Sequence, residues 1–426
     1  MAIHNYFQID KRLLALADRA EAACAGCFAE IDRTARNNAA KILSAFAENR
    51  VSEGCLGGTS GYGYGDMGRD AIDRIAAKVF GAEAGFMRPS ILSGTHALTI
   101  GLFALLRPGD VMLSITGAPY DTLREVIGMD GANGDGSLAD FGVEYDDVDF
   151  APDGAFDFAG IDAALKQYGA RVKVVFLQRS KGYLARPTLT VAQIGEAVRF
   201  VRERTGENTY IVVDNCYGEF TETAEPTAVG VDMIIGSLIK NPGGGMADTG
   251  GYICGTKRAV ELAGNRLCCP GVGLDAGASL GQNRNMLRGL FYAPHTVAQA
   301  IKTAHLAAYM FERAGFDVLP GPFERRSDII QTVSLKTPEK LCRFCQGIQA
   351  ASPVDAHVVP EPWDMPGYAD PVIMAAGAFV GGASIELSAD GPLRAPYTVF
   401  LQGGLTYESG RLGIMAAFDY VLAENG

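Results

Sequence analysis

The spacing of apolar residues changes several times along the chain, and each spacing predicts a different element. Uninterrupted apolar runs predict four strands, at Val111–Ile115, Val172–Leu177, Tyr210–Asp214 and Met233–Gly236. Helical spacing predicts helices between them, at Arg69–Phe80, Thr95–Leu106, Pro119–Gly128 and Val191–Glu203. Strands that are apolar throughout are typical of a parallel sheet with helices on both faces. The central part of the chain is therefore predicted to be an α/β domain.

The two ends of the chain have different patterns. An Ala-rich segment from Lys11 to about Asn49 predicts one or two helices, and the Gly-rich segment Gly54–Gly68 that follows is expected to be too flexible for a regular element. A long helix at Val297–Ala314 precedes short strands and a C-terminal helix. We therefore expect a helical arm (1–60), a large domain (61–300) and a smaller α+β domain (301–426).

Composition limits the class of protein. The 426 residues are 48% hydrophobic and 20% charged, which excludes a disordered chain, and the net charge of −12 argues against binding to nucleic acid or to an anionic membrane. The first twenty residues lack the apolar core of a secretory signal, and the longest uncharged stretch, Pro89–Leu106, is too polar to span a membrane. Nine scattered cysteines indicate reduced thiols. These features predict a cytoplasmic protein.

Two motifs suggest a bound anion and a bound cation. Small residues at Ser93, Gly94 and Thr95 open an apolar helix, which leaves backbone N–H groups for a phosphate; the alternative is an ordinary helix cap by Ser93 or Thr95. Asp214 ends an apolar strand, at the sheet edge where ligands collect, and a carboxylate there needs a cation or a protonated ring nitrogen. A capping or metal-binding role is the alternative for Asp214.

A lysine after the next strand suggests carbonyl chemistry. Lys240 precedes Asn-Pro-Gly-Gly-Gly, and a confined lysine with a lowered pKa can condense with an aldehyde; the alternative is a solvated loop residue. Ser237 could add a hydroxyl to a phosphate site. A phosphate turn, an aromatic residue, a strand-end Asp and Ser-x-x-Lys, in this order, meet the needs of pyridoxal 5′-phosphate.

Other motifs are less informative. The Gly63–Gly68 segment matches G-x-G-x-x-G but follows no strand, so a dinucleotide site is rejected. Two CxxC pairs lie in predicted helices and are interpreted as buried apolar residues, so no metal site is predicted. Three cations, Arg179, Lys181 and Arg186, follow a strand end and could bind a substrate carboxylate or the phenolic oxygen of the cofactor, or lie in a solvated loop.

Taken together, these motifs resemble the fold-type-I pyridoxal-phosphate enzymes of cysteine and methionine metabolism. The likeness extends over nearly the whole chain and is narrowest to the methionine γ-lyase-like, or aluminium-resistance, family. The segments that carry it include GYGYGDMGRDAID, SGTHAL, GAPYDTL, QRSKGY, VVDNCYGEF and SLIKNPGGGMADTGGYI. The resemblance implies the aspartate aminotransferase-like fold of pyridoxal-phosphate-dependent transferases.

The resemblance also implies roles for single residues. Lys240 would bind the cofactor aldehyde and move the Cα proton, Asp214 would hold the pyridine N–H, and the turn Ser93-Gly94-Thr95 would bind the phosphate with Ser237. Tyr120 would stack on the cofactor ring.

Two further parts of the site follow from the same resemblance. Tyr62 or Tyr64 would complete the phosphate pocket of a neighbouring subunit, which implies a homodimer with shared sites or a homotetramer. Arg411 would bind the substrate carboxylate. Asp66 and Met67 stand where the better-studied lyases have an arginine, and Arg69 comes later.

The expected reaction is elimination at Cβ or Cγ of a sulfur amino acid such as cystathionine, cysteine or methionine, with Tyr120, Tyr62 or Tyr64 protonating the departing thiolate. An aminotransferase or a replacement-type synthase uses the same cofactor machinery and is the alternative. A non-catalytic protein that binds pyridoxal phosphate is a third possibility.

Overall fold

The computed structural model describes residues 9–184, 186–365, 368 and 370–423. Its backbone contacts divide the chain into two compact units. One contains Ala40–Leu238 and Met246–Phe291; the other contains the segment up to Ala39, Ile239–Gly245 and the segment from Tyr292 onward. The division predicted near residue 300 falls within a continuous helix, α8 (Asn283–Arg313).

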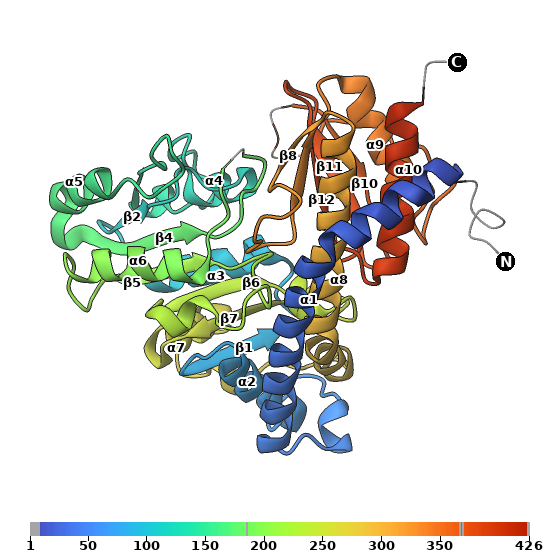
Figure 1. Cartoon of the computed structure of the whole chain (residues 1–426). Helices are drawn as coiled ribbons and strands as arrows, with labels where there is room; N and C mark the ends of the chain where they lie inside the picture. The colour runs from blue at the N-terminus through green and yellow to red at the C-terminus, as the bar shows by residue number, and fades with distance from the viewer. Residues whose placement is uncertain (1–8, 185, 366–367, 369, 424–426) are drawn as a thin grey trace. The chain divides into compact units, whose positions relative to one another are not determined.

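The first unit is built on a seven-stranded sheet with the order β1-β7-β6-β5-β4-β2-β3 (Figure 1). Strands β2 to β6 pair in parallel, and β7 and β1 continue the sheet in antiparallel pairing. The sheet is therefore mostly parallel, as predicted. Its strands are β1 (Ala84–Arg88), β2 (Val111–Ser114), β3 (Glu144–Asp147), β4 (Val172–Gln178), β5 (Tyr210–Asp214), β6 (Met233–Ser237) and β7 (Gly251–Gly255).

Buried apolar side chains lie on both faces of this sheet. On one face, Val212 and Ile235 belong to a core cluster that includes residues of α3, α4 and α7. Side chains at the alternate positions, such as Val213 and Ile234, are fully buried too, which is why these strands are apolar throughout. The helices of this unit are α2 (Met67–Val79), α3 (Gly94–Leu105), α4 (Asp121–Ile127), α5 (Phe158–Tyr168), α6 (Val191–Arg202) and α7 (Lys257–Leu267).

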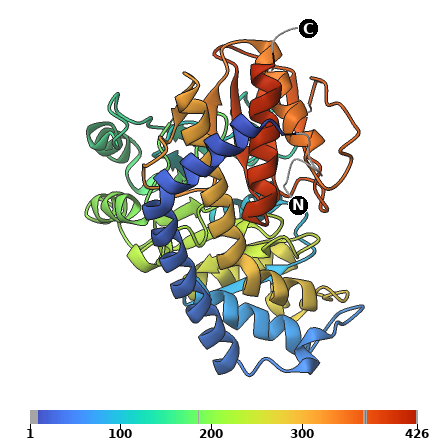
Figure 2. The ribbon, with the colours of Figure 1, turned by 45° about the vertical axis from the view of Figure 1, so that its right-hand side comes forward.

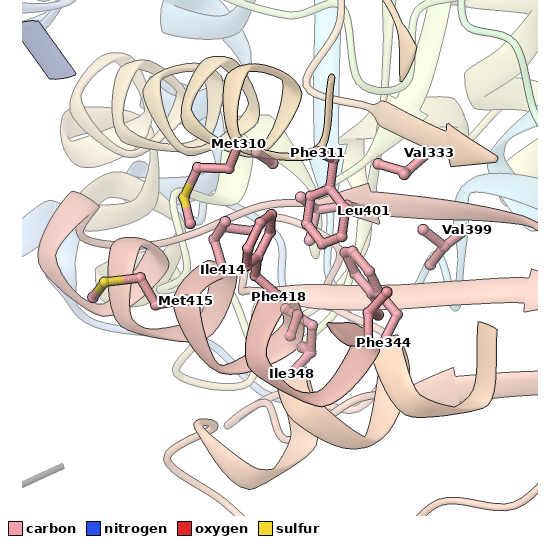
Figure 3. Packing of buried hydrophobic residues seen from close by; sticks show 14 of the residues in the cluster. Met310, Phe311, Val333, Phe344, Ile348, Val399, Leu401, Ile414, Met415 and Phe418 are labelled. Atoms are coloured by element: carbon pink, nitrogen blue, oxygen red, sulfur yellow. The ribbon is translucent and has the colours of Figure 1, made fainter. Parts of the chain in front are cut away.

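The second unit has an antiparallel sheet of five strands in the order β10-β11-β12-β9-β8. Figure 3 shows its core, where Phe311 contacts both Phe344 and Phe418 at ring-centroid distances of 5.1 Å. Its elements are β8 (Asp317–Leu319), β9 (Gln331–Ser334), α9 (Pro338–Ala350), β10 (Val372–Ala375), β11 (Ser388–Pro392), β12 (Thr398–Gln402) and α10 (Tyr407–Leu422).

The N-terminal segment forms a single helix, α1 (Lys11–Glu48), where the sequence left one or two helices open. Figure 2 shows its first half crossing α10, and Ala17 and Ala20 belong to the same core cluster as Ile414 and Phe418. The small side chains of α1 allow this close packing, so the Ala-rich composition serves a tertiary contact as well as helix propensity.

Most predicted elements are confirmed, with ends that differ by a few residues. The long helix is predicted to begin at Val297 but begins at Asn283. It therefore continues through Pro294, a residue type that usually ends or kinks a helix. Among the described residues, no helix combines the length and apolarity needed to cross a membrane.

Candidate active site

The predicted phosphate turn lies at the start of α3. Ser93 caps this helix by accepting a hydrogen bond from the His96 backbone N–H at 3.1 Å, so the capping alternative holds for its side chain. The first turn of a helix leaves backbone N–H groups without intrahelical partners, and Gly94 and Thr95 are in that turn. Capping by Ser93 and anion binding by the following N–H groups are therefore compatible.

The turn lies against the ends of two strands. A Cβ placed on Gly94 would lie 3.5 Å from both Cys216 Sγ and Ser237 Cβ. Ser237 is the last residue of β6, and Cys216 comes two residues after the end of β5. The phosphate turn and Ser237 are thus brought together, as predicted, at the carboxyl edge of the parallel strands where ligands bind in such sheets.

Tyr120 joins the same group. Its hydroxyl lies 2.8 Å from Thr95 Oγ1, and its backbone N–H donates to Gln178 Oε1 at 2.9 Å. Gln178 is the last residue of β4 and is paired in register with Asp214, the last residue of β5. Asp214 is 4% exposed and accepts a hydrogen bond from the Cys216 backbone N–H.

The carboxyl edge of β4, β5 and β6 therefore carries a helix N-terminus, a half-buried tyrosine and a buried carboxylate within one connected group. Gln178, which ends β4 and begins the segment QRSKGY, is not among the site residues predicted from the sequence. The only sequence signal was its place at a strand end, where ligand-binding residues collect.

A buried network fixes the backbone just after Asp214. The amide of Asn215 accepts from Arg179 Nη1 at 2.8 Å and donates to Glu225 Oε2 at 3.0 Å. Asn215 also donates to the hydroxyl of Tyr252, which has its pKa well above 10 because it is buried. Burial raises the pKa of Glu225, and the Arg179 guanidinium opposes this. The carbonyl of Asp214 accepts from the Arg179 backbone N–H, so the network also holds Asp214 itself.

The two predicted tyrosines of the Gly-rich segment are exposed. Tyr62 and Tyr64 are 78% and 62% exposed, and their rings stack at a centroid distance of 5.8 Å. Their segment contains only a short 3-10 turn, η2 (Glu53–Leu56), before α2 begins. The prediction that these tyrosines reach a neighbouring subunit stays a prediction.

Between η2 and α2 this segment forms no regular element, as predicted, but two buried side chains hold it in place. Asp66 accepts hydrogen bonds from Thr59, Ser279 and Asn283 and from the Arg69 backbone N–H. Arg69 donates to the carbonyl of Gly63 at 2.7 Å, on the turn between the two tyrosines. We call this group the Asp66–Arg69 lock. It was missed because its partners are distant in sequence.

The two remaining predicted residues belong to the second unit. Lys240 is half-buried, comes three residues after the end of β6 and directly precedes the 3-10 turn η6 (Asn241–Gly243). Arg411, on α10, forms ion pairs with Asp18 at 2.5 Å and with Glu21 at 2.7 Å. Its predicted role at the substrate carboxylate is not tested by these contacts, but its charge is already balanced by two carboxylates of α1.

The alternative of a solvated loop after β4 is wrong. Arg179, Lys181 and Arg186 are 0%, 1% and 7% exposed. The cysteines of the two CxxC pairs lie in α1 and α9; Cys24 and Cys345 are buried as expected, but Cys27 and Cys342 are half-buried. The described part of the chain holds no group of three or more His, Cys, Asp or Glu that could bind a metal ion.

Relatives that are 46% to 48% identical match this chain over nearly its whole length. The uncharacterized protein YnbB of Bacillus subtilis is 48% identical over 402 residues, which cover 94% of each chain. A solved structure from Clostridium acetobutylicum, described as a proposed cystathionine beta-lyase involved in aluminum resistance, is 46% identical with a TM-score of 0.95 and covers 99% of this chain and 98% of its own. A carbon-sulfur lyase involved in aluminum resistance from Clostridium novyi is 46% identical with a TM-score of 0.93 and covers 97% of both chains.

A more distant likeness bears on the fold alone. The pyridoxal-5′-phosphate-dependent protein YhfS of Escherichia coli is 14% identical with a TM-score of 0.60 over 90% of this chain. The predicted fold of pyridoxal-phosphate-dependent enzymes is confirmed. The methionine gamma-lyase family profile matches residues 13–422. The chain therefore belongs to the methionine gamma-lyase family, and its cofactor is pyridoxal 5′-phosphate.

Proposed function

We propose that this chain is a carbon–sulfur lyase that eliminates a sulfur group from Cβ or Cγ of an amino acid such as cystathionine, cysteine or methionine. The observation that carries the proposal is the connected group at the carboxyl edge of the sheet, in which Thr95, Tyr120 and Gln178 are hydrogen-bonded beside Asp214. The descriptions of the two Clostridium relatives support the same class of reaction.

The residues of this group fit the cofactor. The N–H groups of the α3 turn and the hydroxyl of Ser237 would hold its phosphate. Asp214 is buried, and a buried carboxylate beside a ring nitrogen keeps that nitrogen protonated. Tyr120 would lie against the ring, and Lys240 would hold the aldehyde carbon.

When bound, the cofactor supplies an electron sink that makes the Cα–H of an amino acid acidic. Lys240, released from the cofactor by the substrate amine, would take this proton at Nζ. The Tyr120 hydroxyl, held by Thr95 Oγ1 at 2.8 Å, would give its proton to the departing sulfur. Elimination needs no second substrate, in contrast to the transaminase and synthase alternatives.

Tyr62 and Tyr64 would complete the phosphate pocket of a second copy of this chain, within a homodimer or a homotetramer. Their exposure and their rigid support by the Asp66–Arg69 lock are what such a contact requires.

The first experiment identifies the keto acid that the loaded enzyme releases from L-cystathionine and, separately, from L-methionine. Pyruvate from cystathionine means elimination at Cβ, and 2-oxobutyrate means elimination at Cγ. If neither of these amino acids, nor L-cysteine, yields a keto acid from enzyme that has bound its cofactor, the lyase proposal is wrong and a transaminase or synthase takes its place.

A second experiment tests the role of Lys240. Borohydride reduction should fix the cofactor covalently to the wild-type chain and to Lys257→Ala, an exposed lysine at the start of α7, but not to Lys240→Ala. A covalent adduct on Lys240→Ala would remove Lys240 from this role.

A further inference from the structure

The loop that follows β4 buries three positive charges, those of Arg179, Lys181 and Arg186. A buried cation is strongly destabilising unless a negative group or several hydrogen bonds compensate for it. The question for the two arginines is therefore what balances the charge of each guanidinium.

Arg179 is balanced within the fold. Its guanidinium forms ion pairs with Glu222 at 3.0 Å and Glu225 at 3.5 Å, and it donates to Asn215. All of these partners are buried or nearly so. Arg179 therefore serves the network behind Asp214 and has no need of a ligand.

Arg186 is different. Its Nη1 donates to the carbonyl of Thr116, and its Nη2 donates to the carbonyl of Ser180 at 3.0 Å. Its Nε is buried without a hydrogen-bond partner, and no carboxylate of the described residues lies within ion-pair distance. The two backbone carbonyls orient the guanidinium, and the carboxylates that act on its charge, first Asp149 and then Asp214, form no ion pair with it. Burial lowers the pKa of Arg186 to about 10, so the side chain is still a cation at neutral pH.

The position of Arg186 is at the edge of the sheet that carries the candidate site. Thr116 comes two residues after β2, and Ser180 comes two residues after β4. Gln178 connects the loop to the site, because it accepts from the Tyr120 backbone N–H and donates to the same Ser180 carbonyl. A Cβ on Gly182, in this loop, would lie 3.5 Å from Tyr120 Cβ.

Strand order separates two anion positions at this edge. The order β6-β5-β4-β2 puts Ser237 and the phosphate turn on one side of Asp214, and the carbonyls that hold Arg186 on the other. The cofactor phosphate would use the first position. Asp214, which is among the charges that act on Arg186, would be committed to the ring nitrogen. Asp149 then remains the main carboxylate acting on Arg186, without an ion pair, and the buried Nε of Arg186 still lacks a partner. The α-carboxylate is the anion that an amino-acid substrate brings to this position.

We propose that Arg186 binds the α-carboxylate of the amino-acid substrate. This inference rests on the proposed function. It assigns to the loop after β4 the role that resemblance alone would give to Arg411, whose guanidinium is balanced by Asp18 and Glu21. A planar guanidinium with a free Nε–H is well suited to a carboxylate.

The test uses the loaded enzyme and two ligands that differ only in the carboxylate, L-alanine and L-alaninamide. Binding is measured as the change in cofactor absorbance, without turnover. Charge-assisted hydrogen bonds of this kind change affinity by about 10- to 100-fold. We expect Arg186→Gln to weaken the binding of L-alanine by this factor and to leave the affinity for L-alaninamide nearly unchanged. The control Arg171→Gln removes a half-exposed arginine that pairs with Glu144, and it should alter neither affinity.

Arg186→Lys covers the case in which Arg186→Gln does not fold or does not load its cofactor. The lysine keeps the positive charge but lacks the planar guanidinium with its paired N–H donors. This variant should therefore also weaken the binding of L-alanine more than that of L-alaninamide. Equal weakening of both ligands would overturn the proposal, because Arg186 would then act on the cofactor or on the fold. Loss of the preference for L-alanine in Arg411→Gln but not in Arg186→Gln would overturn it as well. If the wild-type enzyme loads the cofactor but responds to no amino acid, the proposed function fails, and the inference fails with it.

Discussion

The Asp66–Arg69 lock makes a quantitative prediction for Asp66→Asn. Asp66 is 3% exposed, and its burial alone would raise its pKa. Hydrogen bonds from the Arg69 backbone N–H, Ser279, Thr59 and Asn283 outweigh burial and lower the pKa from 3.8 to about 2. The ionised carboxylate is thus favoured in the folded state by about 2 kcal/mol.

The substitution removes the charge and turns one acceptor oxygen into a donor. That NH2 group would face either the N–H donors of Arg69 and Asn283 or the hydroxyls of Thr59 and Ser279, which already accept backbone N–H groups. We therefore expect a loss of about 2–3 kcal/mol in the free energy of unfolding. The assay is urea unfolding at pH 7, read as a shift of the midpoint at constant slope. The matched control is Asp70→Asn, whose carboxylate is 44% exposed and pairs with Arg69 at the surface; its loss should stay below about 1 kcal/mol.

The pH dependence gives a second check. Because the folded-state pKa of Asp66 is lower than its ordinary value, its contribution is fully present above about pH 4 and is lost as the pH falls towards 2. The stability difference between wild type and Asp66→Asn should therefore be constant from pH 8 to pH 5. A difference that disappears by pH 5, or a loss no greater than that of Asp70→Asn, would refute the account of the lock.

Three further predictions concern other parts of the chain. Gly26→Ala should stabilise α1 by up to about 1 kcal/mol, because nothing lies within 4 Å of the new Cβ. Gly68→Ala should instead lower the melting temperature by several degrees, because its Cβ would lie 2.1 Å from a backbone carbonyl oxygen. Glu225→Gln leaves the buried charge of Arg179 partly unbalanced and should cost about 3 kcal/mol in urea unfolding. Burial lowers the pKa of His305 to about 3, so as the pH falls below 6.5 the unfolded chain binds a proton before the folded chain does, and the wild type should lose stability. His305→Gln should make stability less dependent on pH between pH 6.5 and 4, as measured by urea unfolding at several pH values.

Local patterns predicted the parts of the fold that depend on local physics. Strands β4, β5 and β6 are continuous apolar runs, and the sequence placed Asp214 at the end of β5 within one residue. Strands β1 and β7 were missed, because AGFMR and GYICG are short, contain glycine and have no distinctive period. Strand β3 was missed because EYDD is polar.

The candidate site divides in the same way. The predicted phosphate turn and Asp214 follow from a helix start and a strand end, which sequence can locate, whereas Tyr120 was predicted from the family resemblance. The burial of Arg179 could not be predicted, since its partners Glu222 and Glu225 are 43 and 46 residues further along the chain. Charged side chains in loops are mostly solvated, so sequence alone favours an exposed Arg179. Its burial depends on the tertiary structure, which brings the opposite charges together.

The partners of the Asp66–Arg69 lock also set an order of events during synthesis. Asp66 bonds to Ser279 and Asn283, which lie 213 and 217 residues later in the chain. A growing chain on the ribosome therefore cannot close the lock until Asn283 has emerged, however early α2 forms. Tyr62 and Tyr64 acquire their fixed, exposed arrangement only after most of the first unit has been translated. The nascent chain thus does not present this aromatic pair in its final form while its sheet is still incomplete.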